Sequence, residues 1–386
     1  MTSWKKTRIS CLIIIVSLVL VCLGDMVCHY IRLQNFNQSP LSIMTYDGSN
    51  SPYHPSVIYS PQSWGGYHYM MSETPFFFGL PSVGDNYRDQ FENPSIHLSV
   101  DGIHWTSCQA PIDSLTYKQI QDRDYFSDPD LLVSPLGVEC WYRLNRRYGE
   151  ETNQNNIVLY RRITKNGYDW SNPQMIADLE HGDLSEELGN TVISQTLLFE
   201  NNKYKMWFYS GGGFDHGTIS YSESDTTLTS WSNKKTVNLC GPKVAPWHLH
   251  IMKDENFYWL TIYDHKKDIT LWKSKDEVAF EYVSTPVKNS GVIGSFYSHD
   301  LYRACLLKLP SGGYRLYFSA DDGTISSIGV MEGATPETLQ MISVDGKEYC
   351  NLPAFLNTYF RTRWNYISKR SKYYFQRLRQ IIGNKK

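Results

Sequence analysis

The chain has 386 residues, of which 41% are hydrophobic, so it can bury one large core or two ordinary ones. An aromatic fraction of 14% favours strands over helices. A formal net charge of −2 gives no indication of a nucleic-acid-binding protein, and no such partner is expected.

The N-terminus has the pattern of an export signal. Lys5, Lys6 and Arg8 precede an apolar run over residues 9–24, and no Ala-x-Ala-like cleavage site follows. We therefore expect residues 1–33 to form an uncleaved signal anchor, a transmembrane helix, in preference to a cleaved peptide. Because positive residues stay in the cytoplasm, the body of this single-pass membrane protein is expected outside it, in the periplasm or the extracellular space.

The cysteines do not indicate a metal site. No CxxC or Cys/His spacing occurs, so a zinc centre is not expected. One or two disulfides are possible in an oxidising compartment, but the sequence does not reveal their pairing. The five cysteines beyond the anchor are Cys108, Cys140, Cys240, Cys305 and Cys350.

After a polar linker over residues 34–52, one sequence pattern, called the phrase below, recurs along the chain. It consists of a polar residue, an apolar strand, a turn and an aromatic-rich strand. In the clearest copy, Pro129 favours the start of a strand and residues 131–133 form its buried part. Asp128 could also simply cap the turn before this proline. The five copies open at His54, Asp128, Ser194, His248 and Arg303.

The second half of each copy recurs as well. Asp101-Gly102 and Asn166-Gly167 predict tight hairpins, each followed by a tryptophan that packs back on the sheet. Four short strands per unit, repeated every roughly 40 to 70 residues, predict a β-propeller. The expected fold is all-β, a five-bladed β-propeller over residues 53–345. We expect the strand near Ile43 to complete the last blade and close the ring.

In such a propeller the first strand of each blade lines the central channel. The residues that open the five copies should therefore converge at one mouth of the channel. A channel needs a polar lining in any case, but acids, imidazoles and a guanidinium together favour a site for a polar ligand.

With these features the chain resembles the five-bladed propeller glycoside hydrolases, which include arabinanases, xylosidases, invertases and levansucrases. The resemblance covers about residues 53–330 and is carried by Ser127-Asp128-Pro129-Asp130 and the aromatic second strands. A resemblance to the arabinanase-like branch implies an Asp that opens blade one as general base and a Glu on blade three as general acid. It also implies an Asp on blade two that tunes the acid and orients the substrate. Asp128 matches the second position, but His54 stands at the first and Ser194 or Gln195 at the third.

This departure matters because glycoside hydrolysis requires a proton donor and a second carboxylate. Substitutes for the missing acids are available, although each could be an ordinary surface residue. The expected catalytic residues are Asp128, His54, Glu92, Glu187 (next to Glu186) and Asp300. The expected substrate-binding residues are Asp130, Gln195, Trp247, His248, His250, His299 and Arg303.

Strand alternation places His248 and His250 on one face, where they could seat a metal or flank a sugar ring. A hydrogen-bonded pair is the favoured interpretation, so no metal ligand and no cofactor are assigned. The resemblance implies that a structural calcium on the propeller axis is possible, without support from the residues.

The last segment, residues 346–386, predicts a basic amphipathic helix. From Arg361 onward it holds nine basic residues and no acidic one, with apolar residues near helical spacing. Docking on anionic lipid or polysaccharide is favoured. A helix packed on the propeller and a frayed tail are the alternatives.

The sequence thus predicts a membrane-anchored, glycosidase-like protein that acts on a cell-envelope or extracellular polysaccharide by hydrolysis or glycosyl transfer. The alternative is a propeller that has lost its hydrolase acids and binds glycan or assists polysaccharide assembly.

Overall fold

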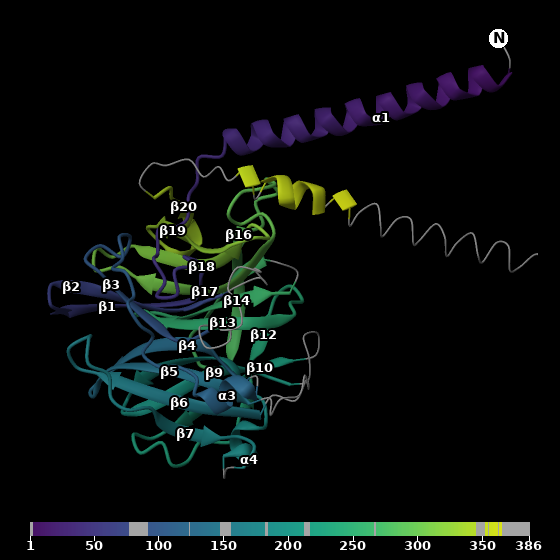
Figure 1. The fold of residues 1–386 in the computed structure, drawn as a ribbon. Helices are drawn as coiled ribbons and strands as arrows, with labels where there is room; N and C mark the ends of the chain where they lie inside the picture. The colour runs from purple at the N-terminus through teal and green to yellow at the C-terminus, as the bar shows by residue number, and fades with distance from the viewer. Residues whose placement is uncertain are drawn as a thin grey trace, which may run out of the picture.

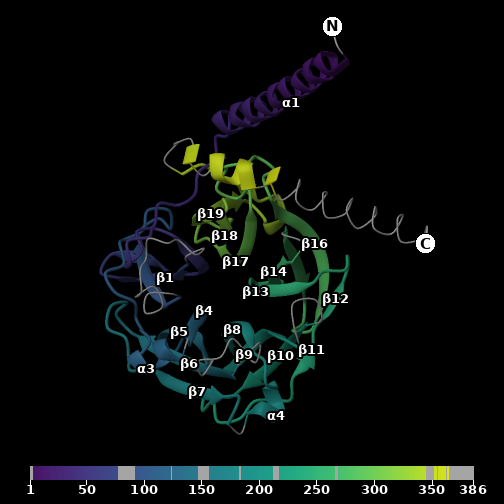
Figure 2. The same ribbon diagram turned by 45° about the vertical axis from the view of Figure 1, so that its right-hand side comes forward.

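In a computed structural model of the chain, five antiparallel sheets surround a common axis (Figures 1 and 2). This confirms the predicted five-bladed propeller. The structure describes residues 3–76, 92–122, 124–146, 156–181, 184–211, 217–265, 268–344, 352–353, 355–361 and 363–364.

Each blade is an up-and-down sheet that begins at the axis and ends at the rim. Blade one contains β1 (Pro52–Trp64), β2 (Tyr67–Pro75) and β3 (Ser95–Ser99). Blade two contains β4 (Tyr125–Ser134), β5 (Gly137–Arg146), β6 (Asn156–Thr164) and β7 (Gln174–Asp178). Blade three contains β8 (Ile193–Glu200), β9 (Lys203–Ser210), β10 (Thr218–Ser224) and β11 (Lys235–Thr236).

The remaining two blades follow the same plan. Blade four contains β13 (Pro246–Lys253), β14 (Tyr258–Asp264), β15 (Asp268–Ser274) and β16 (Ala279–Lys288), with β12 (Asn238–Cys240) parallel to β16. Blade five contains β17 (Asp300–Lys308), β18 (Tyr314–Asp321), β19 (Ser326–Gly333) and β20 (Gln340–Met341). The first strands contact one another in the order β1, β4, β8, β13, β17 and back to β1, which closes the ring around the axis.

The predicted hairpins and their tryptophans are present. Gly102 and Gly167 have φ of +73° and +82°, a conformation that glycine adopts without the Cβ penalty of other residues. Trp105 and Trp170 each pair back on the preceding strand through an isolated bridge, as does Trp231 in blade three.

The core lies between neighbouring blades and not inside any one of them. Four hydrophobic clusters fill these spaces, because the sheets pack their faces against the neighbouring blades. Trp141, Trp207 and Trp272, from blades two, three and four, are fully buried there.

The segment before blade one lies at the outer edge of blade five. The amide of Leu41 donates to the carbonyl of Ile328 in β19 (2.8 Å), and Ser39 bonds to Val344 just after β20. Leu41 and Ile43 pack between blades five and one. The segment is thus placed where the sequence analysis expected it, but it does not form a regular strand.

Few helices accompany the sheets. They are α1 (Ser3–Gln34), α3 (Tyr117–Gln121), α4 (Ser185–Leu188) and the 3₁₀ turn η2 (Pro336–Thr338). Helical residues also occur between 352 and 364. The part of the basic tail from residue 365 onward lies outside the described residues.

The end of α1 and the C-terminal helix pack on each other beside blade five (Figure 1). Tyr359 donates to Asp25 at 2.7 Å, and the ring of Phe355 meets that of Tyr30. Among the described residues, no helix is both long and apolar enough to cross a membrane. Six cysteines whose side chains the structure describes form no disulfide: Cys22, Cys28, Cys108, Cys140, Cys240 and Cys305.

Candidate functional site

Three first strands present a polar side chain from a strained position at the axis. His54, Asp128 and Ser194 have φ of +53°, +53° and +50°, a left-handed conformation that costs a non-glycine residue about 1 kcal/mol or more. The pairing register of β1, β4 and β8 shifts at these points. The same left-handed conformation, at a shift of register, thus recurs at the opening residue of three successive blades.

Asp128 lies at the centre of this arrangement and is fully buried. Its Oδ2 accepts hydrogen bonds from Arg143 Nε (2.6 Å) and from the amide of Ser194 (3.0 Å). Burial by itself raises the pKa of Asp128, but Arg143 together with His248, His54 and Arg303 outweighs it and holds this pKa well below the usual range. Asp128 therefore stays ionised near neutral pH and cannot serve as a proton donor.

The other oxygen of Asp128 faces two imidazoles. Oδ1 is 3.7 Å from His54 Nε2 and 3.4 Å from His248 Nδ1, and it accepts no hydrogen bond from the described residues. Burial lowers the pKa of His54 to about 3 and the pKa of His248 well below its ordinary value. Both rings are thus neutral at physiological pH and keep a lone pair.

These three side chains fit a divalent metal ion. One donor atom from each of His54, Asp128 and His248 lies within 4.8 Å of the other two. Ligands of one ion at about 2.1 Å from it lie roughly 3 to 3.5 Å apart, close to the distances observed here. His54 Nδ1 is bonded to Thr74 Oγ1 at 2.7 Å, the kind of contact that orients a metal-binding imidazole.

A second layer of expected site residues lies deeper along the axis. Arg303 is fully buried and donates to Asp130 Oδ1 (2.8 Å) and to the carbonyls of Pro129 and Gln195. Gln195 donates to the carbonyl of Asp128 (2.6 Å), and His250 contacts Cys305. These four expected substrate-binding residues (Asp130, Gln195, His250 and Arg303) are thus engaged with the protein itself and hold the first strands together.

Aromatic rings border His54, Asp128 and His248, the candidate metal-binding set. The ring of Tyr302 lies 3.9 Å from that of His248 and 5.3 Å from that of His54, and it stacks on Tyr53 at 4.8 Å. Trp247, an expected binding residue, donates from Nε1 to the Tyr302 hydroxyl (3.0 Å). Tyr302 and Trp247 are half-buried, whereas the imidazoles are buried, so these two rings lie between the metal-binding set and solvent.

Glu92 is the second expected carboxylate that reaches this region. It is buried and has a φ of +52°. Burial lowers the pKa of Arg143, but Asp128 and, more weakly, Glu92 raise it, with a net increase. Glu92 also contributes to the raised pKa of Tyr302, after burial and Asp128. The charge of Glu92 thus affects the pKa of both residues.

His299 and Asp300 belong to a neighbouring group on blade five. His299 Nδ1 bonds to Asp321 Oδ1 (2.7 Å), and Asp300 accepts from the hydroxyl of Tyr263 (3.1 Å). Tyr263 separates this group from the metal-binding set, since its ring lies between Asp300 and the ring of Tyr302 (5.3 Å).

Glu187 is not brought to the axis. It lies on α4 at the outer margin of the propeller (Figure 2). Its carbonyl accepts from the amide of Lys234, next to the rim strand β11. The loop position of Glu187 ahead of blade three suggested an axial position that the fold does not provide.

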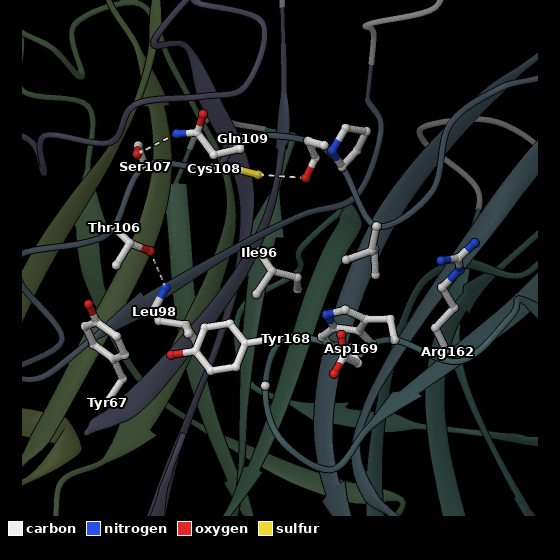
Figure 3. Close-up of a pocket in the computed structure, with 15 residues that line it drawn as sticks. Tyr67, Ile96, Leu98, Thr106, Ser107, Cys108, Gln109, Arg162, Tyr168 and Asp169 are labelled. Carbon is white, nitrogen blue, oxygen red and sulfur yellow. Dashed lines mark hydrogen bonds between the residues drawn. The ribbon is translucent and has the colours of Figure 1, made fainter. Parts of the chain in front are cut away.

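A separate cavity of about 700 Å³ lies between the rims of blades one and two (Figure 3). Tyr67, Ile96 and Leu98 from blade one line it, together with Arg162 and Tyr168 from blade two. It contains none of the metal-binding or aromatic residues of the axial site.

Sequence reasoning found His54, Asp128 and His248 but assigned them separate roles and no metal. The signal was present, because all three occupy the same position in the repeated phrase. Tyr302 was missed because the register of β17 shifts between Leu301 and Ala304. That shift presents the residue before Arg303 to the metal-binding layer.

Comparisons with known proteins agree on the fold. No family model matches the chain. The chain is 23% identical to an A-type blood N-acetyl-alpha-D-galactosamine deacetylase from Flavonifractor plautii, over 76% of this chain and 43% of that protein. It thus spans less than half the length of this curated relative.

Solved structures also agree on the fold. An N-acetylgalactosamine deacetylase from F. plautii, in complex with blood group B trisaccharide, superposes with a TM-score of 0.57 at 19% identity, covering 77% of this chain and 95% of that one. A family-43 glycoside hydrolase from Xanthomonas citri, complexed with xylotriose, gives 0.57 at 11% identity, covering 84% and 99%. A β-xylosidase, RS223, gives 0.55 at 11% identity, covering 79% and 98%. The chain has the five-bladed propeller fold of these carbohydrate-active enzymes.

Proposed function

We propose that this protein is a carbohydrate-active hydrolase that removes the acetyl group from an N-acetylated sugar, with a divalent metal ion held by His54, Asp128 and His248. The observation that carries the proposal is the free Oδ1 of Asp128 between two neutral imidazoles. A carboxylate and two imidazoles are a donor set that suits divalent transition-metal ions. The relative named as a deacetylase of an N-acetylated sugar supports this choice of reaction.

In the reaction, water adds to the carbonyl carbon of the acetamido group and the C–N bond breaks. The nitrogen gains a proton, and the products are acetate and the free amino sugar. A metal ion held by these three side chains would supply Lewis acidity. We assign to Glu92, a buried carboxylate whose charge affects the pKa of Arg143 and Tyr302, the role of taking the proton from water and returning it to the nitrogen.

Cleavage of a glycosidic bond suits the site less well. It requires a carboxylic acid that protonates the leaving oxygen, and Arg143 keeps Asp128 ionised. Ser194 occupies the position where the resemblance implies the general acid, and it binds the neighbouring blade at Leu249. Glu92 alone cannot fill both carboxylate roles.

The experiment measures acetate released from p-nitrophenyl N-acetylhexosaminides and from A-type blood trisaccharide by the metal-loaded protein. We expect acetate without free p-nitrophenol or monosaccharide. His248→Gln and Glu92→Gln should each reduce the rate at least about 100-fold, the size typical for loss of a general base or a metal ligand.

Glu187→Gln is the matched control, because Glu187 lies at the rim, and it should keep the wild-type rate. Release of p-nitrophenol without acetate would favour the glycosidase interpretation instead. Glycan binding without any turnover would favour a non-catalytic binding module.

We further propose that α1 holds the propeller at a membrane, on the non-cytoplasmic side, where its substrate would be part of an envelope or extracellular polysaccharide. The basic residues ahead of the apolar run support this orientation. Leu20 and Val21 of α1 are 63% and 69% exposed, and Trp364 is 71% exposed, an unusual amount of open apolar surface. Resistance to carbonate extraction of membranes is the expected result, and recovery in the soluble fraction would contradict it.

A further inference from the structure

The hydroxyl of Tyr302 is available as a hydrogen-bond donor. Its oxygen already accepts a hydrogen bond from Trp247 Nε1 at 3.0 Å. Among the described residues nothing accepts the hydrogen of Tyr302 itself. A tyrosine hydroxyl both donates and accepts, so the contact with Trp247 fixes the oxygen and leaves the donor available to a ligand.

The position of this donor is defined by packing on every side. The ring lies against His248 (3.9 Å between centroids) and His54 (5.3 Å), and Tyr53 stacks on its other side at 4.8 Å. Tyr263 is 5.3 Å away. With four rings around it and its oxygen held by Trp247, the side chain has little freedom to leave the two imidazoles.

From this geometry we propose that Tyr302 donates its hydroxyl hydrogen to the carbonyl oxygen of the acetyl group and stabilises the negative charge that grows there; this rests on the proposed deacetylation. Water addition turns the planar carbonyl into a tetrahedral centre with a charged oxygen. A fixed donor next to that oxygen binds it more strongly than it binds the neutral carbonyl, which accelerates the reaction.

Asp128 is an ionised acceptor and cannot perform this function. Arg143 donates to Asp128 from Nε and to Asn145 from Nη1, so these two groups are already engaged. The imidazoles that serve as metal ligands are not available as donors on that side. Tyr302 is thus the neutral donor that the described part of the site offers at this position.

The test compares Tyr302→Phe with Tyr263→Phe. Both changes remove one hydroxyl from neighbouring, packed rings, but the Tyr263 hydroxyl already donates to Asp300 at 3.1 Å. We expect Tyr302→Phe to lower kcat for acetate release about 100- to 1000-fold with little change in KM, the cost typical of one lost oxyanion donor. Tyr263→Phe should stay within about threefold of wild type.

A second measurement does not depend on turnover. Isothermal titration with Mn²⁺ should give the same affinity in wild type and Tyr302→Phe, because the three metal-binding side chains are unchanged. A phosphonamidate that mimics the tetrahedral centre should bind at least tenfold more weakly to Tyr302→Phe, while binding of the N-acetyl sugar itself changes less. Trp247→Phe, which frees the Tyr302 hydroxyl from its anchor, should give a smaller loss in kcat.

The outcomes separate the two proposals. If His248→Gln loses acetate release and Tyr302→Phe matches Tyr263→Phe, the role of Tyr302 is wrong and the deacetylase function stands. If Tyr302→Phe loses its metal affinity together with its activity, Tyr302 serves to build the metal site and is not an oxyanion donor. If the metal-loaded wild type releases no acetate from any of the probes, both proposals fail.

Discussion

The two carboxylate oxygens of Asp128 have different surroundings. One oxygen is held by Arg143 and by the amide of Ser194, and the other is left facing His54 and His248. A buried charge is stable only when it is paired and hydrogen-bonded. Arg143 supplies that pairing from the adjacent strand β5, and Oδ1 is left without a hydrogen bond from the described residues.

The buried histidines make the stability depend on pH. Burial lowers the pKa of His54 and of His250 to about 3, whereas an unfolded histidine titrates near pH 6.5. The stability of the fold with these two rings buried and neutral is therefore fully present above about pH 6.5. It is lost as the pH falls toward 3, because the unfolded chain takes up more protons than the folded one.

We expect His250→Gln to reduce this acid sensitivity. The slope of unfolding free energy against pH between 6 and 4 should fall by up to about 1.4 kcal/mol per pH unit, the contribution of one proton. Urea denaturation at several pH values measures it. Equal slopes for His250→Gln and wild type would contradict the buried, neutral state of His250.

At this scale the sequence predicted the polar openings of the repeated phrase but not their partners. His54, Asp128 and His248 could be placed near one another because each opens a copy of the phrase. The pairing of Asp128 with Arg143 joins β4 to β5. In β17, the register shift between Leu301 and Ala304 presents Tyr302, instead of Arg303, to the two imidazoles. Neither follows from spacing, since both depend on bulges that one sequence does not mark.

At the scale of elements, the hairpins carry contacts between blades. Gly167, in the turn after β6, has φ of +82°, and a Cβ placed on it would come within 2.7 Å of Trp64 Cβ in blade one. Gly66, in the turn between β1 and β2, has φ of +96° but would meet no atom within 4 Å. The two glycines therefore separate backbone strain from crowding.

Gly167→Ala should lower the free energy of unfolding more than Gly66→Ala. The positive φ costs each variant about 1 kcal/mol, and crowding against Trp64 adds about 1 to 3 kcal/mol for Gly167→Ala alone. Equilibrium denaturation of both variants gives the comparison. Equal losses would mean that Trp64 and the turn of blade two are not in tight contact.

The elements themselves were largely predictable because the same pattern occurs five times. Each copy contains an apolar first strand and an aromatic second strand, and the glycine turns indicate where they meet. Residues 41–46 are the exception. Their apolar residues pack between blades five and one as a strand would, but only Leu41 bonds to β19 in the regular manner of an edge.

At the scale of the whole molecule, the ring converts short, separate motifs into one site. The first strands close a circle, so Asp128 and His248, which follow His54 by 74 and 194 residues along the chain, reach the same site as His54. What decides membership of the site is the position within the blade. Glu187, on a connection at the rim, fails that criterion, whereas Glu92, on the connection that follows the mouth end of β2, meets it.

The most direct test of the account is anomalous X-ray scattering from crystals grown with Mn²⁺ or Zn²⁺. The account predicts one peak at about 2.0 to 2.3 Å from donor atoms of His54, Asp128 and His248, and loss of that peak in His248→Gln crystals of the same form. No peak at this position at saturating metal, or a peak that survives in His248→Gln, would contradict the central claim that these three side chains form a metal centre.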